Sequence, residues 1–342
     1  MTAAARLAAL ALSIVAATVG QSPEISKYAD DLRSADALLS RGDFSGVIET
    51  LQPWPERLPD RPEARHFLGL AHYRLRNFSD AIQHLTAALE REEPESAPWK
   101  QTVEILAVAY FFEGRWQEAV PLLEQASSWK PHDSEFLYTL AVTYVRSGRA
   151  NQARIPFSKI FQVDPASPEA FALAAELLSQ EGRLDDAEAL LVNARALQPD
   201  LPGVDYALGA IELRRGDYAK ASELLRRDLE RYPRHPAAWH AMGEALLGLG
   251  SQAESVEALR RAIWLDTGSV KSYILLAKIY MDQNLLELAE DTVRRAIQIH
   301  PQSYEAHFLQ SRIYYKTGRS DRARQHLGIA EEVRRLEEQS LE

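Results

Sequence analysis

Cysteine is absent from this 342-residue chain, and other features that carry chemistry are missing as well. Without cysteine there can be no disulfide, no thiolate nucleophile and no cysteine-ligated metal. The sequence also has no glycine-rich phosphate loop, no GxSxG elbow and no HExxH helix. No two of its nine histidines stand four residues apart, the spacing that places two ligands on one helical face. These absences predict a protein that is not an enzyme and that uses no cofactor or metal.

Basic residues are outnumbered: 39 Lys and Arg against 49 Asp and Glu give a formal net charge of -10. General nucleic-acid binders and anionic-membrane binders need a basic surface. Hydrophobic residues make up 46% and charged residues 26%, which is typical of a soluble folded chain. We therefore predict no nucleic-acid partner.

An apolar run occurs only at the start, where MTAAARLAALALSIVAATVG carries the single charged side chain of Arg6. A basic start, a short apolar core and small residues at the end are typical of a secretory signal, with cleavage after Gly20. The core of about 13 residues is short of the roughly 20 that span a bilayer. We expect an exported protein, periplasmic or secreted, with no integral span after cleavage. A capping helix and an uncleaved anchor are the alternatives.

A fixed period runs through the rest of the chain. Pro131, Pro165, Pro199 and Pro233 stand 34 residues apart, and Pro301 lies two periods further on. The period places blocks at residues 28, 62, 100, 134, 168, 202, 236, 270 and 304, with a slip of four residues before Lys100. Such a spacing predicts one array of nine units over 28–337, after a segment at 21–27 and before a tail at 338–342.

Each block has the pattern of two amphipathic helices. In the fourth block, Leu137, Leu140 and Tyr144 recur at helical spacing before Gly148, and Phe157 and Ile160 do so after it. Glycine suits the left-handed backbone at which a helix stops and the chain reverses. The same place holds Gly in most other blocks, Asn284 in the eighth and Arg76 in the second, with Arg76 expected to take that conformation less readily.

Small and large residues alternate at fixed places. The eighth place is small in every block: Ala35, Gly69, Ala107, Ala141, Ala175, Gly209, Gly243, Ala277 and Ser311. A large apolar residue follows sixteen places later, as at Leu85, Leu225 and Leu259. This pairing predicts facing helices that interdigitate. Two irregularities stand out: the four added residues predict a longer loop in EREEPESAPW, and Pro156 predicts a bent second helix, whereas Pro121 is expected to cost little.

Leu106-Ala107, Tyr110, Gly114, Ala119, Leu123, Ala126 and Pro131 resemble the tetratricopeptide repeat signature, as do Leu140-Ala141, Tyr144, Gly148, Ala153, Phe157 and Pro165. The resemblance implies an all-α fold, an α-solenoid of about nine 34-residue helix-turn-helix repeats that coil into a right-handed superhelix. It also implies that the first helices line a concave surface. The first and ninth blocks depart most from the pattern, as expected of terminal repeats.

If that geometry holds, particular places of each block face the concave groove, and their residues are the candidate partner-binding set. These residues are His66, Tyr73, Arg74, Glu104, Phe111, Tyr138, Arg146, Glu176, Tyr206, Arg214, His240, Lys271, Lys278, Arg312 and Tyr315. The set is aromatic throughout, acidic early and basic late. Aromatic and Arg side chains commonly anchor interfaces. We therefore expect a non-catalytic scaffold or adaptor whose partner is a protein or extended peptide.

Three alternatives remain from the sequence. The array could be a structural spacer in an envelope assembly for polysaccharide or protein export, with its convex or end surfaces binding. Stacked rings could favour a glycan in the groove. An enzyme is disfavoured, since it would need an acid-base pair across the groove such as Glu104 with Glu135.

Overall fold

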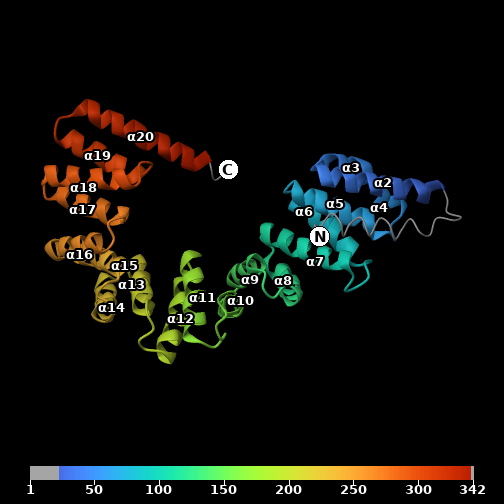
Figure 1. The fold of residues 1–342 in the computed structure, drawn as a ribbon, viewed down its shortest axis with the longest axis horizontal. Helices are drawn as coiled ribbons and strands as arrows, with labels where there is room; N and C mark the ends of the chain where they lie inside the picture. The colour runs from blue at the N-terminus through green and yellow to red at the C-terminus, as the bar shows by residue number, and fades with distance from the viewer. Residues whose placement is uncertain (1–22, 340–342) are drawn as a thin grey trace. The chain divides into compact units, whose positions relative to one another are not determined.

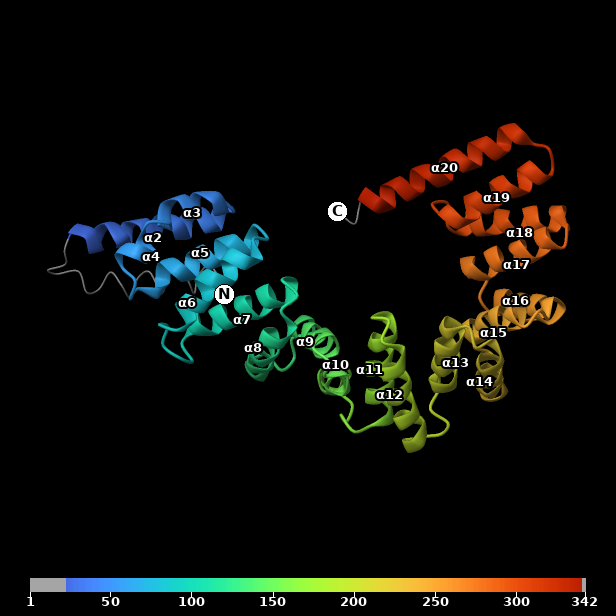
Figure 2. The same cartoon turned by 180° about the vertical axis from the view of Figure 1, so that it is seen from behind.

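The computed structural model describes residues 23–339, and every regular element in that range is a helix (Figure 1, Figure 2). The predicted signal peptide and its cleavage site lie outside the described residues. The chain divides into two compact units, unit 1 up to Glu181 and unit 2 from Gly182. None of the helices in the described range is long and apolar enough to cross a bilayer.

Unit 1 consists of consecutive helices that pack in pairs. Its elements are α2 (Pro23–Arg41), α3 (Phe44–Leu51), α4 (Trp54–Arg57), α5 (Pro62–Arg74), α6 (Phe78–Leu89), α7 (Ala97–Phe112), α8 (Trp116–Trp129), α9 (Ser134–Arg146), the 3-10 turn η1 (Ala150–Ala153), α10 (Arg154–Phe161) and α11 (Pro168–Gln180).

Unit 2 continues the same alternation of first and second helices. Its elements are α12 (Leu184–Leu197), α13 (Val204–Arg215), α14 (Tyr218–Arg231), α15 (Pro236–Gly248), α16 (Gln252–Leu265), α17 (Val270–Asp282), α18 (Leu286–Ile299), α19 (Tyr304–Lys316) and α20 (Ser320–Gln339). Helices α5, α9, α11, α15, α17 and α19 begin at the residues where the period places the start of a block. The all-α helix-pair fold is confirmed.

The turn inside each pair requires a left-handed residue. Gly148 has φ +83°, and Asn284 takes the same place with φ +60°. Arg76 also adopts this conformation, with φ +62°, although its Cβ is disfavoured there. The turn is closed by backbone bonds from Arg76 N to Tyr73 O (3.0 Å) and from Asn77 N to His72 O (2.9 Å). The hydrogen bonds that end helix α5 therefore hold Arg76 in a left-handed conformation that its side chain disfavours.

Replacing Arg76 with glycine is expected to stabilise unit 1 by about 1 kcal/mol, because glycine removes the Cβ strain at a positive φ. The measurement is the midpoint of urea unfolding followed by circular dichroism. Arg76→Ala is the matched control, since it removes the same side chain but keeps the Cβ. An equal gain from both variants would show that the guanidinium, and not the backbone, was responsible.

Small residues face large ones within the helix pairs α5–α6, α13–α14 and α15–α16. A Cβ built on Gly243 of α15 would lie 2.7 Å from Leu259 Cγ on α16, and one on Gly69 would lie 2.5 Å from Leu85 Cγ. Ala277 on α17 and Val293 on α18 are both fully buried. The predicted interdigitation is confirmed, and it fixes how closely the two helices of a pair approach.

The first helix pair is closed by Trp54, which is buried against Tyr28 in an edge contact with ring centroids 5.1 Å apart. Its indole nitrogen donates to Asp31 (2.9 Å), while the Tyr28 hydroxyl donates to Glu63 (3.2 Å). The atypical first block is therefore a cap that covers the apolar end of the array.

The four added residues do not form only a loop. Ser96 caps α7 by accepting from Trp99 N (3.3 Å), and α7 starts at Ala97, three residues ahead of Lys100. Residues 90–96 nevertheless form a seven-residue connection between α6 and α7, longer than the four residues between α8 and α9, so the predicted longer loop is confirmed and part of the added length extends α7.

Pro156 was predicted to interrupt the second helix of its pair, and this helix is indeed split into η1 and α10. Pro156 is the third residue of α10, where a backbone N–H has no helical partner. Pro121 lies deeper, at the sixth residue of the continuous helix α8, where a backbone N–H would pair inside the helix. The expectation that Pro121 costs little is therefore wrong.

Candidate functional site

Unit 1 carries a chain of aromatic side chains along the ends of its first helices. Ring centroids of Tyr73 and Phe78 are 6.0 Å apart, and Phe78 stacks on Phe112 at 5.1 Å. Phe111 lies edge-on to Phe112 at 5.4 Å and to Trp116 at 5.5 Å. This aromatic ladder joins two helix pairs, and Phe112 is its most open member, with 52% of its surface exposed.

Arg146 extends the ladder to a third pair. Its guanidinium lies 5.1 Å from the Trp116 ring and donates to Glu181 at 2.8 and 3.1 Å. A cation over an indole is held by the ring quadrupole. The prediction had selected Tyr73, Phe111 and Arg146, and the structure brings them onto one continuous surface.

His66 is a correction. It was predicted to face the groove, but only 2% of it is exposed. Its Nδ1 lies 2.7 Å from Thr102 Oγ1 and 3.2 Å from Glu92 Oε1, and both partners are buried. His66 is therefore a structural residue, held under the segment that precedes α7.

The other predicted residues of unit 1 are partly or fully accessible. Arg74 and Glu176 are exposed, and Tyr138 is 48% exposed with its edge on Phe157. Glu104 accepts from Trp129 Nε1 (3.1 Å) and Lys130 Nζ (2.7 Å). A carboxylate engaged in this way is poorly placed for the acid-base pairing with Glu135 that an enzyme would need.

Unit 2 gathers charged side chains on the surface formed by α15, α17 and α19, here called the first-helix face. His240 Nδ1 lies 3.0 Å from Ser272 Oγ on α17, and its Nε2 lies 3.6 Å from Glu244 Oε1. The contact with His240 lowers the pKa of Glu244, and Lys271 and Lys278 act in the same direction. All four side chains therefore share one electrostatic environment, although they come from two helices.

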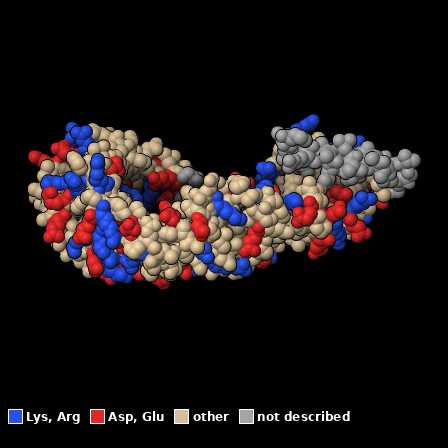
Figure 3. Space-filling model, turned by 60° about the horizontal axis from the view of Figure 1, so that its bottom comes forward, with Lys and Arg blue, Asp and Glu red and all other residues tan. Residues whose placement is uncertain are grey.

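Three exposed cations on this face are free of salt bridges within residues 23–339. Lys271, Lys278 and Arg312 are exposed, and none of them forms a salt bridge with another residue in the described range. Tyr315 follows Arg312 by three residues on α19, with 49% of its surface exposed. In the view of Figure 3, Lys and Arg side chains gather at the left, over unit 2, among Asp and Glu side chains.

Tyr206 and Arg214, the remaining predicted residues, lie on α13. Tyr206 is half-buried and packs against the His235 ring at 4.7 Å, whereas Arg214 is exposed. Part of the Tyr206 ring is therefore covered by His235, so less of this ring than of the Tyr138 ring is accessible to a partner.

Two histidine pairs bridge the two helices of a pair. His72 and His84 stack with centroids 5.5 Å apart, and His307 Nδ1 lies 2.9 Å from His326 Nδ1. Burial lowers the pKa of His84 to about 4, with the neighbouring His72 acting in the same direction. Burial and His307 likewise lower the pKa of His326. Residues 23–339 contain no cluster of three or more His, Cys, Asp or Glu that could hold a metal.

Acid is expected to destabilise unit 1 through His84. Its folded pKa of about 4 lies below the ordinary 6.5, so the unfolded chain binds the proton first. Neutral His84 contributes fully to the free energy of unfolding above pH 6.5. This contribution decreases as the pH falls and levels off below about pH 4, and the total loss of stability exceeds 1 kcal/mol. Urea unfolding of the wild type and His84→Gln between those pH values measures it. Equal acid sensitivity in both proteins would contradict this assignment.

Sequence reasoning did not select Phe78 and Trp116, which complete the aromatic ladder. Both occupy the first residue of a second helix, directly after the left-handed turn. The candidate set was drawn from first helices only, so these residues were outside it. A large aromatic residue recurring at that place was the available signal.

Sequence models described as tetratricopeptide repeat match residues 32–98, 110–177, 178–245, 236–267 and 274–331, which is most of the chain. The chain belongs to the tetratricopeptide repeat family. The matching models all describe this repeat, and none of them is of an enzyme.

Several relatives carry the same repeats. TPR repeat-containing protein YpiA of Bacillus subtilis is 26% identical over 126 residues, which covers 37% of this chain and 30% of the relative. Human tetratricopeptide repeat protein 13 is 28% identical over 155 residues, or 43% of this chain and 18% of the relative. The matched part thus spans less than a third of either relative.

Solved structures with a similar fold include MamA, at 21% identity and TM-score 0.44, covering 48% of this chain and 96% of that one. Another is the APC/C hetero-tetramer Cut9-Hcn1, at 18% identity and TM-score 0.45, covering 85% of this chain and 57% of that one.

Proposed function

We propose that this tetratricopeptide repeat protein is a non-catalytic scaffold that holds an extended segment of a partner protein on the first-helix face of unit 2. The observation that carries the proposal is the set of exposed cations Lys271 and Lys278 on α17 and Arg312 on α19, which form no salt bridge in the described range. Tyr315, three residues after Arg312 on α19, has an exposed ring. Lys271 and Lys278 lower the pKa of Glu244 but form no salt bridge with it, so these cations can still pair with carboxylates of a ligand. An exposed aromatic ring can anchor an apolar side chain.

The experiment compares partner capture by the wild type and by the double variant Lys278→Glu, Arg312→Glu. Both side chains are exposed, so the fold should be retained, which circular dichroism checks. We expect the purified partner to bind the double variant at least about tenfold more weakly. Charge reversal of Arg74 on unit 1 is the matched control. Equal affinity of the wild type and the double variant would exclude the first-helix face as the binding surface.

We also propose that the protein acts outside the cytoplasm, in the cell envelope or as a secreted protein. The support is the pattern of residues 1–20, with its basic start, short apolar core and small residues before the expected cleavage point. Mass spectrometry of the mature protein from its native host tests this. A mature chain starting at Gln21 is expected, and one starting at Met1 or Thr2 would contradict cleavage.

A further inference from the structure

Trp264 on α16 is the most exposed of the large apolar side chains in the described range, with 65% of its surface open. Single exposed apolar residues are common on proteins and need no explanation. Trp264 differs because it borders a hollow, and because a cation is stacked on it. The Arg261 guanidinium lies 4.4 Å from its ring centroid.

The hollow lies between α16 and α18, with α17 beneath it, and has a volume of about 470 Å³. Its walls are mainly apolar, from Ile263, Trp264, Tyr273, Leu276 and Leu288. Ligand pockets of a few hundred Å³ with apolar walls and a few polar groups are typical binding sites. The size suits a bulky side chain together with part of the segment that carries it.

Charges at the edge of this hollow are unbalanced. Asp291 already accepts from Arg294 at 2.9 Å, and Arg295 donates only to Gln298, at 3.1 Å. Neither Arg261 nor Arg295 forms a salt bridge with a carboxylate in residues 23–339. Arg295 at the edge of the hollow and Arg261 on the Trp264 ring are therefore free to pair with carboxylates of a ligand.

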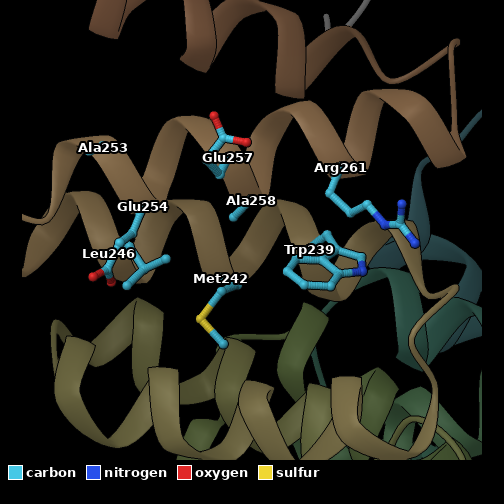
Figure 4. A pocket seen from close by; sticks show the side chains of 8 residues that line it. All are labelled: Trp239, Met242, Leu246, Ala253, Glu254, Glu257, Ala258 and Arg261. Atoms are coloured by element: carbon cyan, nitrogen blue, oxygen red, sulfur yellow. The ribbon is translucent and has the colours of Figure 1, made fainter.

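Arg261 also lines a second hollow, of about 520 Å³, on the other side of α16. Figure 4 shows Trp239 and Met242 projecting into it from α15, with Arg261 at the same end as the Trp239 indole. The two hollows flank α16, and Arg261 lines the second one together with Glu254 and Glu257. Arg261 reaches the first hollow only through its contact with the Trp264 ring. Together they provide two aromatic anchors, and aromatic and Arg residues are the side chains that dominate binding energy at interfaces.

We infer that the hollow beside Trp264 forms a second docking surface, which takes an acidic segment of a partner protein through a bulky apolar side chain. The apolar side chain enters beside Trp264, while carboxylates on either side of it meet Arg261 and Arg295. This surface is separate from the first-helix face, so the chain can hold two segments at once. The scaffold is thereby bivalent, and bridging two segments raises the overall affinity without new contacts.

The test is differential panning of a random peptide phage library on the full chain and on three variants. Trp264→Ala and Arg295→Glu alter the hollow, and both side chains are exposed, so the fold is retained. Tyr315→Ala is the matched control, since it removes an exposed aromatic ring from the first-helix face. We expect the wild type and Tyr315→Ala to share a set of enriched acidic peptides with one large apolar residue, and we expect this set to be missing from Trp264→Ala and Arg295→Glu.

Synthetic copies of the enriched peptides then give the affinities. Trp264→Ala is expected to weaken binding at least about tenfold, and a peptide with lysine in place of its acidic residues should not bind. The inference is wrong if the same peptides are enriched on the wild type and on Trp264→Ala, if they are basic or neutral, or if Trp264 only mediates self-association. If every enriched peptide is lost on Tyr315→Ala and kept on Trp264→Ala, the first-helix face is upheld and this second surface is overturned.

Discussion

His66→Ala is expected to destabilise unit 1 by about 3 kcal/mol, because it leaves the buried carboxylate of Glu92 without its nearest partner. The Glu92 side chain is 4% exposed, and its Oε2 already has no hydrogen-bond partner in the described residues. A carboxylate in that position can neither be solvated nor paired after the substitution. Hydrogen exchange of the α5 and α7 amides, together with the urea midpoint, measures the loss.

The control for this prediction is His66→Leu combined with Glu92→Leu. Removing both polar groups should lower the free energy of unfolding by less than removing His66 alone does. Replacing a buried pair by apolar residues often leaves the stability nearly unchanged. If the double variant is less stable than His66→Ala, the pair contributes net stability, and the unpaired-carboxylate argument fails.

Gly243→Ala is expected to destabilise unit 2 by about 1–3 kcal/mol, although alanine is the better helix former. The reason is geometric: a new Cβ would lie 2.7 Å from Leu259 Cγ and 2.8 Å from its Cδ2. Leu259 is fully buried, so it cannot move aside without disturbing its neighbours. Leu259→Ala should itself cost about 2–5 kcal/mol through the cavity that it leaves.

The decisive measurement is the double variant Gly243→Ala, Leu259→Ala. Its destabilisation should fall short of the sum of the two single losses by about 1 kcal/mol or more, since the clash disappears with the leucine. Gly328→Ala in α20 is the matched control, because nothing lies within 4 Å of its added Cβ. That variant should be more stable than the wild type by about 1 kcal/mol, because alanine has a higher helix propensity than glycine. Strict additivity would show that the two positions do not interlock.

Residues at the same place of the repeat differ in burial, and this is where sequence reasoning was limited. His66, Tyr138 and Tyr206 all occupy the fifth place of a block. Tyr138 is 48% exposed, Tyr206 is half-buried against His235, and His66 is covered by Glu92 from the segment before α7. The place in the repeat sets the direction of a side chain. What covers it depends on neighbouring segments that the period does not constrain.

Arg76 gives a second example of the same limit. The period of the sequence predicts a left-handed turn at this position, although Arg adopts a left-handed backbone less readily than Gly or Asn. The structure shows φ +62°, because the packing of α5 on α6 and the bonds that close the turn require it. A repeated tertiary arrangement therefore imposes a backbone conformation that the local residue disfavours.

The sequence alone determined the period, the helix pairs, the turn positions and the pairing of small with large residues. Each of these follows from local spacing: residues at helical intervals share a face, and a fixed number of residues separates facing partners. Only the tertiary structure showed that His66 is buried, that Phe78 and Trp116 complete the aromatic ladder, and that Trp264 borders a hollow. Those facts depend on contacts between helices of neighbouring pairs, where side-chain size and loop length decide which surfaces are covered and which stay open.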